Sequence, residues 1–194
     1  ALMHGTTIAT NAVLQRRLAC AALVTTAGFE DVLEIGRHVR KEIYANRAEE
    51  RVLLIPRRYR FGLKERMCAD GSVETPLKPA AVQAVIDCLV ATKPEAIAVC
   101  LLHAYANSAH EEQIAEAIAL ALPGVPLSLS HRICPEVREF ERTSTTVLNA
   151  MLVPTVQGYL NNLRHSMSTL GLTAPVYLVQ SNGGAATPET AAGQ

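Results

Sequence analysis

The sequence predicts an α/β fold of βαβ units with a mixed, mostly parallel sheet. Two observations lead to this class. Short apolar runs alternate along the chain with segments of amphipathic helical periodicity, the order expected of right-handed βαβ units. In addition, the run at residues 96–102 is apolar throughout, as in a strand of a parallel sheet with both faces covered.

The first half of the chain contains several short elements separated by turns. A buried strand is indicated where an apolar run ends in Thr26-Ala27-Gly28, and Glu30 and Asp31 suit the first turn of the helix that follows. Residues 36–56 show no clear period. The expected elements are a helix at 10–17, a strand at 19–25, a helical face at 29–35, loose alternation at 59–68, and a hairpin turn at 69–72 leading into a strand at 73–75.

The second half has clearer patterns. Ser108 to Glu111 reads as a capping box that starts a helix ending at Pro123-Gly124, and Pro154 is expected to kink or split a later, long helix. The expected elements are a helix through Val82, Val85, Ile86 and Leu89, a strand at 96–102, the capped helix with Ile114, Ile118 and Leu122 on one face, a strand at 125–130, the long helix from 135 to 167, and a strand at 176–180.

Composition excludes several classes of protein. The chain has 194 residues, 49% of them hydrophobic, and a formal net charge of +0, which excludes disorder and gives no general nucleic-acid signature. Its apolar runs are too short to span a bilayer, and no secretory leader is recognised, so a cytoplasmic protein is expected. Its five cysteines are widely spaced without a CxxC motif, which indicates free thiols rather than a zinc site.

The basic residues are concentrated in one stretch. Ten of the eighteen Lys and Arg residues lie between Arg37 and Arg66, against four acids. Such a stretch suits a nucleic-acid or phosphate patch, or a solvated connection whose charges are partly paired. We favour the paired connection, because residues 57–60 interleave only one aromatic residue for base stacking.

Three polar clusters are candidates for a site. The first joins Gly5, Thr6 and Thr7 to Asn11 at the start of a helix, which suits an anion contact or an ordinary N-cap. The second, residues 139–146, places four consecutive hydroxyl residues in a helical pattern, which calls for a packed neighbour or a role at a site. The third, residues 180–184, follows a strand at the edge where α/β sheets bind ligands, although it also suits a glycine-rich turn.

Other common catalytic motifs are missing from the sequence. It has no P-loop, no Gly-x-Gly-x-x-Gly fingerprint and no nucleophile elbow, and its cysteines lie in apolar segments where thiols are inert. His103 and His131 follow expected strands and suit a cleft or, more simply, structural hydrogen bonds.

Taken together, the three clusters resemble the hydantoinase/oxoprolinase family, specifically the N-terminal part of its hydantoinase A-type subunit. The pair ERTSTTVLNA and QSNGG is the most specific part of the resemblance. The matching segments are HGTTIATNAVL (4–14), LVTTAGFEDVLEIGR (23–37), PRRYRFGLKERM (56–67), DGSVETPL (70–77), PEVREFERTSTTVLNAMLVP (135–154) and QSNGG (180–184).

The resemblance implies an ATP-dependent enzyme that opens cyclic amides such as hydantoins, 5-oxoproline or lactams through a phosphorylated intermediate, with Mg²⁺ neutralising phosphate charge. It implies an actin-like ATPase fold with ribonuclease-H-like halves, a hydantoinase B-type partner subunit and an oligomer without nucleic acid or membrane. Residues 1–184 would form the family's N-terminal-type domain, and residues 185–194 a loosely held tail that begins the next domain.

The family's two phosphate loops, one before the HGTT segment and one after QSNGG, do not occur in this chain. We therefore expect the main ligands of ATP and Mg²⁺ outside it, expect no ATPase activity from the chain alone, and assign no catalytic residue and no metal ligand. Arg37 is also open to interpretation as a structural ion pair. The residues that the resemblance places near a substrate or phosphate cleft are Thr6, Thr7, Asn11, Arg37, Arg142, Thr143, Ser181, Asn182, Gly183 and Gly184.

Two alternatives stay open. The same resemblance suits a subunit of an ATP-dependent ketone carboxylase. A non-catalytic interaction or scaffold domain is a second alternative from a different class.

Overall fold

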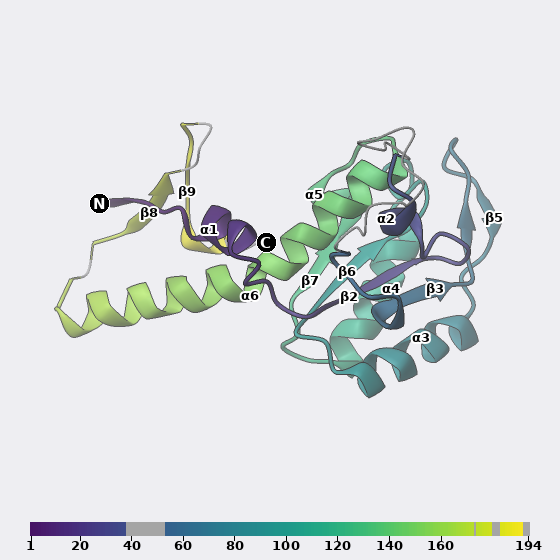
Figure 1. Ribbon diagram of the computed structural model, residues 1–194, viewed down its shortest axis with the longest axis horizontal. Helices are drawn as coiled ribbons and strands as arrows, with labels where there is room; N and C mark the ends of the chain where they lie inside the picture. Colours follow the sequence, from purple (N-terminus) through teal and green to yellow (C-terminus); the bar gives the residue numbers. More distant parts are fainter. Residues whose placement is uncertain (38–52, 173, 180–182, 192–194) are drawn as a thin grey trace, which may run out of the picture. The chain divides into compact units, whose positions relative to one another are not determined.

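The computed structural model describes residues 1–37, 53–172, 174–179 and 183–191 (Figure 1). The chain divides into two compact units. Unit 1 comprises Ala1–Ala19 and Met151–Gln194, and unit 2 is the continuous stretch Cys20–Ala150. Helix α6 (Glu139–Thr169) contributes its first part to unit 2 and its second part to unit 1.

Unit 2 is built on a four-stranded sheet in which every neighbouring pair is parallel. The strand order is β3-β2-β6-β7, with Val24 opposite Val99 in the central pair. The strands are β2 (Ala21–Thr26), β3 (Arg60–Leu63), β6 (Ala96–Cys100) and β7 (Leu127–Leu129). The order of elements in the sequence had predicted this mostly parallel sheet, and the structure confirms it.

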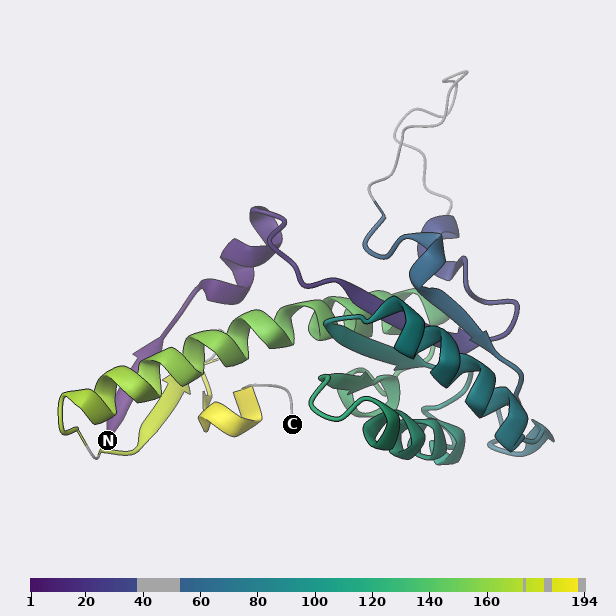
Figure 2. The same ribbon diagram turned by 90° about the horizontal axis from the view of Figure 1, so that it is seen from below.

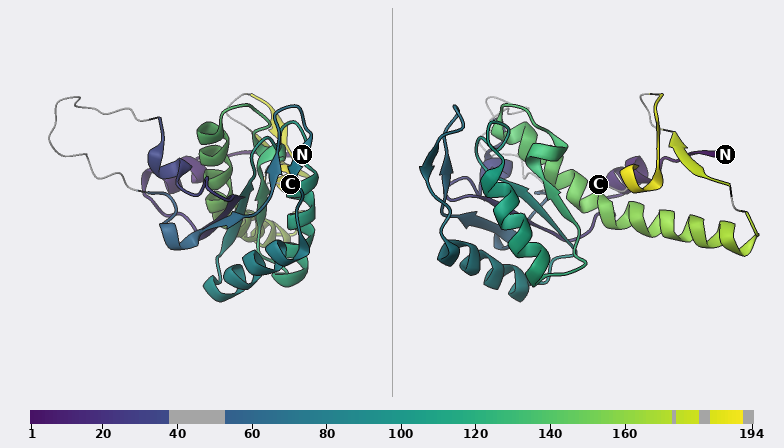
Figure 3. Two further views of the ribbon diagram at one scale, coloured as in Figure 1. Left: turned by 90° about the vertical axis from the view of Figure 1, so that its right-hand side faces the viewer. Right: turned by 180° about the vertical axis from the view of Figure 1, so that it is seen from behind.

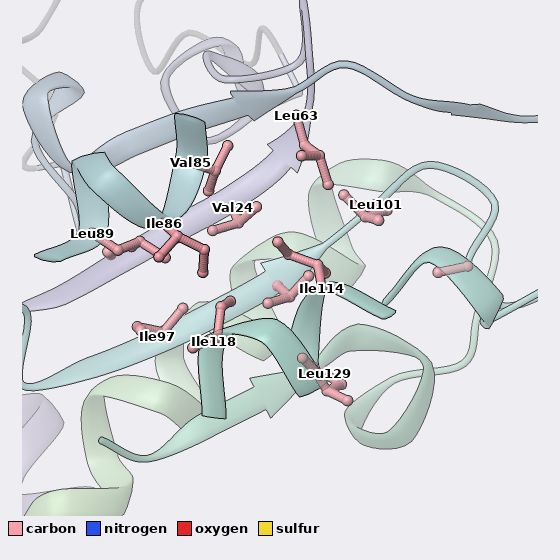
Figure 4. Packing of buried hydrophobic residues seen from close by; sticks show 14 residues of the cluster. Val24, Leu63, Val85, Ile86, Leu89, Ile97, Leu101, Ile114, Ile118 and Leu129 are labelled. Atoms are coloured by element: carbon pink, nitrogen blue, oxygen red, sulfur yellow. The ribbon is translucent and has the colours of Figure 1, made fainter. Parts of the chain in front are cut away.

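Helices α3 (Pro79–Thr92) and α4 (Ala109–Ala121) form the crossovers and cover one face of the sheet (Figure 2). Apolar side chains of the strands point toward them, among them Val24, Ile97 and Leu129 (Figure 4). They meet the apolar faces of both helices, where Leu89 and Ile114 are fully buried. Each such side chain contributes about 1.5–3 kcal/mol by leaving water, so this cluster is the main source of stability in unit 2.

The opposite face of the sheet lies against the first part of α6 (Figure 3). On β6 and β7 it carries small residues, whereas β2 places the buried Leu23 there. Along β6 this face alternates with the core face and presents Ala96, Ala98 and Cys100, all buried. The Asn149 side chain of α6 donates to Ser128 Oγ of β7 at 2.9 Å. Small side chains on the strands allow the helix backbone to approach the sheet closely, because larger ones would hold it away.

A hairpin follows β3 within unit 2. Strands β4 (Arg66–Met67) and β5 (Val73–Thr75) pair antiparallel, as the turn at 69–72 predicts. Gly71 has a φ of +82°, which an L residue rarely adopts. Asn107 donates to the Gly71 carbonyl at 2.9 Å and ties the turn to the loop before α4.

Unit 1 holds a smaller sheet of order β1-β8-β9, in which β1 and β8 are parallel and β9 is antiparallel. His4 of β1 bonds to the Tyr159 hydroxyl of α6, and the two rings stack. Its elements are β1 (Leu2–Gly5), α1 (Ile8–Leu14), β8 (Val176–Val179), β9 (Ala185–Ala186) and α7 (Pro188–Ala191). Residues 185–191, which we expected to be loosely held, therefore form a strand and a helical turn.

The remaining elements are α2 (Val32–Ile35), the 3-10 turn η1 (Arg57–Tyr59) and α5 (Ser130–Ile133). Three sequence predictions need correction. The first helix begins at Ile8 rather than residue 10, and α6 begins at Glu139 rather than Pro135. Of the two outcomes expected at Pro154, the split does not occur and the kink stays a prediction, because a proline removes one backbone hydrogen bond while the turns on either side stay intact.

Candidate functional site

The first polar cluster lies at the carboxyl end of a parallel strand pair in unit 1. Strands β1 and β8 run in the same direction, and Gly5 lies opposite Val179. Thr6 and Thr7 therefore follow β1 at the same edge of the sheet at which β8 ends with Val179. Parallel α/β sheets bind ligands at this kind of edge.

Thr6, Thr7 and Asn11 are exposed and bonded locally. Thr7 occupies the N-cap position of α1, but its hydroxyl makes no capping bond and instead accepts from Asn11 Nδ2 at 3.2 Å. Thr6 Oγ1 accepts from the Ile8 N–H at 3.3 Å. The simple N-cap interpretation thus fits the position of Thr7 and not its hydrogen bond, and the hydroxyl protons of both threonines remain available to an acceptor.

The third cluster is described only in part. Ser181 and Asn182 lie outside the described residues, so their predicted role stays a prediction. Gly183 and Gly184 are exposed, and Gly183 has a φ of +84° that requires glycine. Among the candidates of unit 1, the structure thus brings Thr6, Thr7 and Asn11 together and places Gly183 and Gly184 just before β9.

The second cluster belongs to unit 2, where Arg142 is buried. The guanidinium donates to the Leu101 carbonyl at 3.1 Å and to the Glu136 carbonyl at 2.9 Å, and it lies over the Tyr105 ring. Only 1% of Arg142 is exposed, so a ligand would reach it only if neighbouring segments moved. Its role at a cleft therefore stays a prediction.

The hydroxyl block that follows Arg142 is accommodated by packing and by bonds within the helix. Thr143 contacts the Cys100 thiol of β6 at 3.1 Å. Ser144 and Thr146 donate to helix carbonyls four residues earlier, both at 2.7 Å. Three of the four hydroxyl groups of the block thus have a partner, one on β6 and two within the helix. This favours the alternative in which packing, rather than a role at a site, explains the block.

The basic stretch is largely paired where it is described. Arg37 forms an exposed ion pair with Glu141, which matches the structural alternative for that residue. Arg60 is buried and bonds to Asp31 and Glu34, at 3.0 and 3.1 Å. Arg57 also pairs with Asp31. The interpretation as a connection with paired charges therefore holds for these residues, while residues 38–52 lie outside the described part of the chain.

Two buried carboxylates that were not among the predicted site residues organise the carboxyl edge of the large sheet. Glu65 accepts a hydrogen bond from the Thr26 hydroxyl and bonds to His110 Nδ1 at 2.7 Å. Thr26 Oγ1 in turn accepts the Leu102 N–H at 2.9 Å. This chain of bonds joins β2, the segment after β3, the end of β6 and the start of α4.

Glu111 is the second buried carboxylate, and it corrects the predicted capping box. Its side chain does not cap α4 but accepts the Leu101 N–H at 2.9 Å and the Ser130 hydroxyl at 2.7 Å. Asn107 Oδ1 instead accepts the Ala109 N–H at the start of the helix. Arg142 donates to the Leu101 carbonyl, so the buried carboxylate and the buried guanidinium bond to the N–H and the C=O of the same residue.

His131 follows β7 and contacts two carboxylates. Its Nδ1 lies 2.7 Å from Glu111 Oε2, and its Nε2 lies 2.8 Å from Glu112 Oε1. The bond to Glu111 is the main cause that raises the pKa of His131 above its usual value, against the effect of burial. The structural alternative for this histidine is thereby confirmed. The expected parallel sheet was the signal that could have predicted these contacts, since it places the end of β7 beside the first turn of α4.

The described residues limit other kinds of site. Within them, no group of three or more His, Cys, Asp or Glu side chains is arranged to hold a metal ion. All five cysteines are free, as the spacing predicted. No helix in the described ranges is both long and apolar enough to cross a membrane.

Comparison with known proteins adds a family match over most of the chain. A model of the hydantoinase/oxoprolinase N-terminal region matches residues 1–121, and a second hydantoinase/oxoprolinase model matches residues 142–194. An uncharacterised protein of Methanocaldococcus jannaschii is 40% identical over 94% of the chain. Caprolactamase subunit alpha of Pseudomonas jessenii is 34% identical over 95% of the chain, and acetophenone carboxylase gamma subunit of Aromatoleum aromaticum is 31% identical over 95%.

Solved structures agree with this match. The chain superposes on the ATP-dependent caprolactamase of Pseudomonas jessenii with a TM-score of 0.87 at 34% identity, covering 96% of this chain and 27% of that one. A nucleotide-free acetone carboxylase gives a TM-score of 0.80 at 24% identity, covering 98% and 29%, which supports the fold alone. The chain also spans 27% of the length of each of the three relatives described above.

Proposed function

Because the chain belongs to the hydantoinase/oxoprolinase family, we propose that it is part of an ATP-dependent subunit that opens a cyclic amide. The observation that carries this proposal is the parallel pairing of β1 and β8 in unit 1, which ends with Gly5 opposite Val179 and puts Thr6 and Thr7 at the carboxyl edge of the sheet. Relatives of this chain are a caprolactamase subunit and 5-oxoprolinases, one of which, from Arabidopsis thaliana, is 30% identical over 96% of the chain.

The polar groups at this edge fit a phosphate and not a magnesium ion. Thr6 and Thr7 offer exposed hydroxyl donors, and glycine at position 183 permits close approach of backbone. Proteins usually hold a magnesium ion through one or two carboxylates, and the described residues of this cluster include none. In this proposal the threonines hold phosphate oxygens, while any Mg²⁺ ligands come from other residues.

ATP would supply the phosphoryl group that activates the amide oxygen, so that water then attacks the ring carbon. The chain's own contribution is positional. The Thr6 and Thr7 hydroxyls donate to phosphate oxygens and hold them at the edge of the sheet, and Asn11 orients Thr7 through its amide, since Nδ2 donates to the Thr7 hydroxyl oxygen. That bond leaves the Thr7 proton free to point at the ligand.

A ketone carboxylase subunit is the second candidate function, because the acetophenone carboxylase gamma subunit matches the chain almost as closely as the caprolactamase subunit. The same edge would then hold phosphate during activation of an enol or of bicarbonate. For either function we infer that the subunit acts together with a B-type partner subunit in an oligomer. The free cysteines support a reducing cytoplasm.

The experiment is an ATP-hydrolysis and product assay on the full-length subunit with its partner. Caprolactam, 5-oxoproline and hydantoins form one arm, and ketones with bicarbonate form the other. We expect amide-dependent ATP hydrolysis that Thr7→Ala lowers about tenfold, the effect of about 1.4 kcal/mol lost in the transition state. The matched control is Thr75→Ala, on an exposed position of β5. If neither substrate class stimulates ATP hydrolysis, both enzymatic proposals fail and the non-catalytic scaffold alternative stands.

A further inference from the structure

Two consecutive glutamates of α4 hold the short helix α5. Glu111 accepts the Ser130 hydroxyl at 2.7 Å and the His131 N–H at 3.1 Å, and its Oε2 also lies 2.7 Å from His131 Nδ1. Glu112 receives Arg132 through both oxygens at 2.8 Å and lies 2.8 Å from His131 Nε2. Residues 130–132 are thereby clamped to the start of α4.

The clamp requires a protonated His131. An ionised carboxylate only accepts hydrogen bonds, so both ring nitrogens must carry protons if both contacts are hydrogen bonds. The charged groups that face the ring are Glu111 and Glu112 of α4 and Arg132 of its own helix. Behind Glu111 lie the buried Cys100 thiol of β6 and, beyond it, Arg142 of α6. The two adjacent carboxylates outweigh these groups and favour the imidazolium.

The chain then crosses from the clamp to α6 through residues 134–138, which we call the strap. The Cys134 N–H donates to the Ser130 carbonyl at 2.9 Å, so α5 anchors the beginning of the strap. At its other end Arg138 has a φ of +88°, a strained conformation for a residue other than glycine. Val137 is 64% exposed, and no apolar packing holds it down. The strap is therefore held mainly at its ends.

The strap covers the Arg142 guanidinium. The Glu136 carbonyl accepts from Arg142 Nη1 at 2.9 Å, and burial leaves Arg142 Nε without a partner among the described residues. No carboxylate in the described ranges forms an ion pair with Arg142. A buried cation with two carbonyl acceptors and one unsatisfied N–H is costly, so its concealment depends on the strap staying in place.

We propose that residues 134–138 form a latched strap over Arg142, which the imidazolium of His131 holds closed and which opens when His131 loses its proton. Deprotonation turns one ring N–H into a lone pair that faces a carboxylate oxygen, so a charge-assisted hydrogen bond becomes a repulsive contact. Opening replaces the Glu136 carbonyl with solvent at Nη1 and gives Nε an acceptor. The strain at Arg138 is released by the same movement.

The direction of the pH dependence follows from the raised pKa of His131. The imidazolium, and with it the closed strap, is present below that pKa. As the pH rises through it, the latch is lost and Arg142 becomes accessible. The strap is thus closed on the acidic side and open on the alkaline side.

Nuclear magnetic resonance tests the proposal on the intact chain. The ¹⁵N shifts of His131 Nδ1 and Nε2 should both be those of a protonated nitrogen at pH 5.5, a full unit below the usual pKa of histidine. Solvent exchange of the Cys134 amide and of the Arg142 Nε–H reports whether the strap is open. A single protonated nitrogen on His131 at pH 5.5, a full unit below the usual pKa of histidine, would overturn the proposal.

Comparing a His131 variant with the wild type at one pH avoids the intrinsic pH dependence of hydrogen exchange. At pH 5.5, His131→Gln should lower the protection of the Arg142 Nε–H and the Cys134 amide about tenfold, as expected for the loss of one charge-assisted hydrogen bond. The control His165→Gln, at an exposed position of α6, should leave both unchanged. Equal protection in His131→Gln and the wild type would overturn the latch.

If the His131→Gln variant does not fold, exchange measurements on the wild-type chain alone test the latch. Its exchange rates, corrected for intrinsic base catalysis, should accelerate across the titration of His131. Corrected rates that stay flat across that titration would overturn the proposal.

Discussion

Replacing Glu111 by glutamine tests the central carboxylate of unit 2. The substitution keeps the size and shape of the side chain, but it removes the charge and turns one oxygen into an N–H donor. Glu111 is fully buried and is surrounded by donors: the Leu101 and His131 N–H groups, the Ser130 hydroxyl and His131 Nδ1. Whichever way the amide turns, at least one N–H donor meets another donor.

The magnitude follows from the least costly orientation. With the new NH₂ group toward Leu101 and Ser130, the serine hydroxyl can rotate to accept, but the Leu101 N–H stays buried and unsatisfied. One charge-assisted hydrogen bond, about 1.5–3 kcal/mol, is then lost, and the desolvation of one unpaired donor adds about 1–3 kcal/mol. We expect a loss of about 3–5 kcal/mol in the free energy of unfolding, in the range for breaking a buried charge pair.

Urea denaturation at pH 7, followed by far-ultraviolet circular dichroism, measures this loss. The matched control is Glu116→Gln, the same change on the exposed side of the same helix, and it should stay within about 0.5 kcal/mol of the wild type. A loss below about 1 kcal/mol for Glu111→Gln would refute the reasoning, because the four hydrogen bonds would then contribute little to stability.

Three further predictions concern other parts of unit 2. Burial raises the pKa of the Cys100 thiol, so iodoacetamide should label the exposed Cys88 in the native chain and spare Cys100; equal labelling by mass spectrometry would contradict this. Ala98→Leu should lower the free energy of unfolding by about 1–3 kcal/mol, measured as a lower urea midpoint, since Ala98 is fully buried on the face that α6 covers. The hydrogen bond from Arg132 lowers the pKa of Glu112, so the stability that it provides is lost as the pH falls through that pKa; in Arg132→Gln the pKa should rise, and an unchanged ¹³C carboxyl titration would count against the contact.

Regular elements followed closely from local patterns. The apolar face of α3 and the fully apolar strand β6 were predictable, because burial on one side or on both leaves a periodic trace in the sequence. Element ends were less predictable. The start of α4 shows why: Ser108 and Glu111 have the spacing of a capping box, yet Asn107 makes the bond to the helix and Glu111 turns into the interior.

The residues of the candidate site also differ in how far the sequence predicted their surroundings. Thr6 and Thr7 stood out because glycine and hydroxyl residues before a helix have a local chemical meaning, and parallel pairing of β1 and β8 is consistent with that interpretation. Arg142 stood out only by family resemblance, and local patterns carried no information on its burial. Its contacts come from residues 41 and 6 positions away, at the end of β6 and in the strap.

The sequence by itself determined the family, the α/β class and the order of strands and helices, since each depends on residues that are neighbours along the chain or on the turn of one helix. Only the tertiary structure decided which polar side chains became buried partners. In the sequence Glu65 has no distinguishing pattern, Glu111 has the spacing of a helix cap, and His131 only follows an expected strand; none of them shows its partner. They are joined because parallel strands carry the segments after them to one edge of the sheet, where a buried carboxylate must find donors from whatever elements meet there.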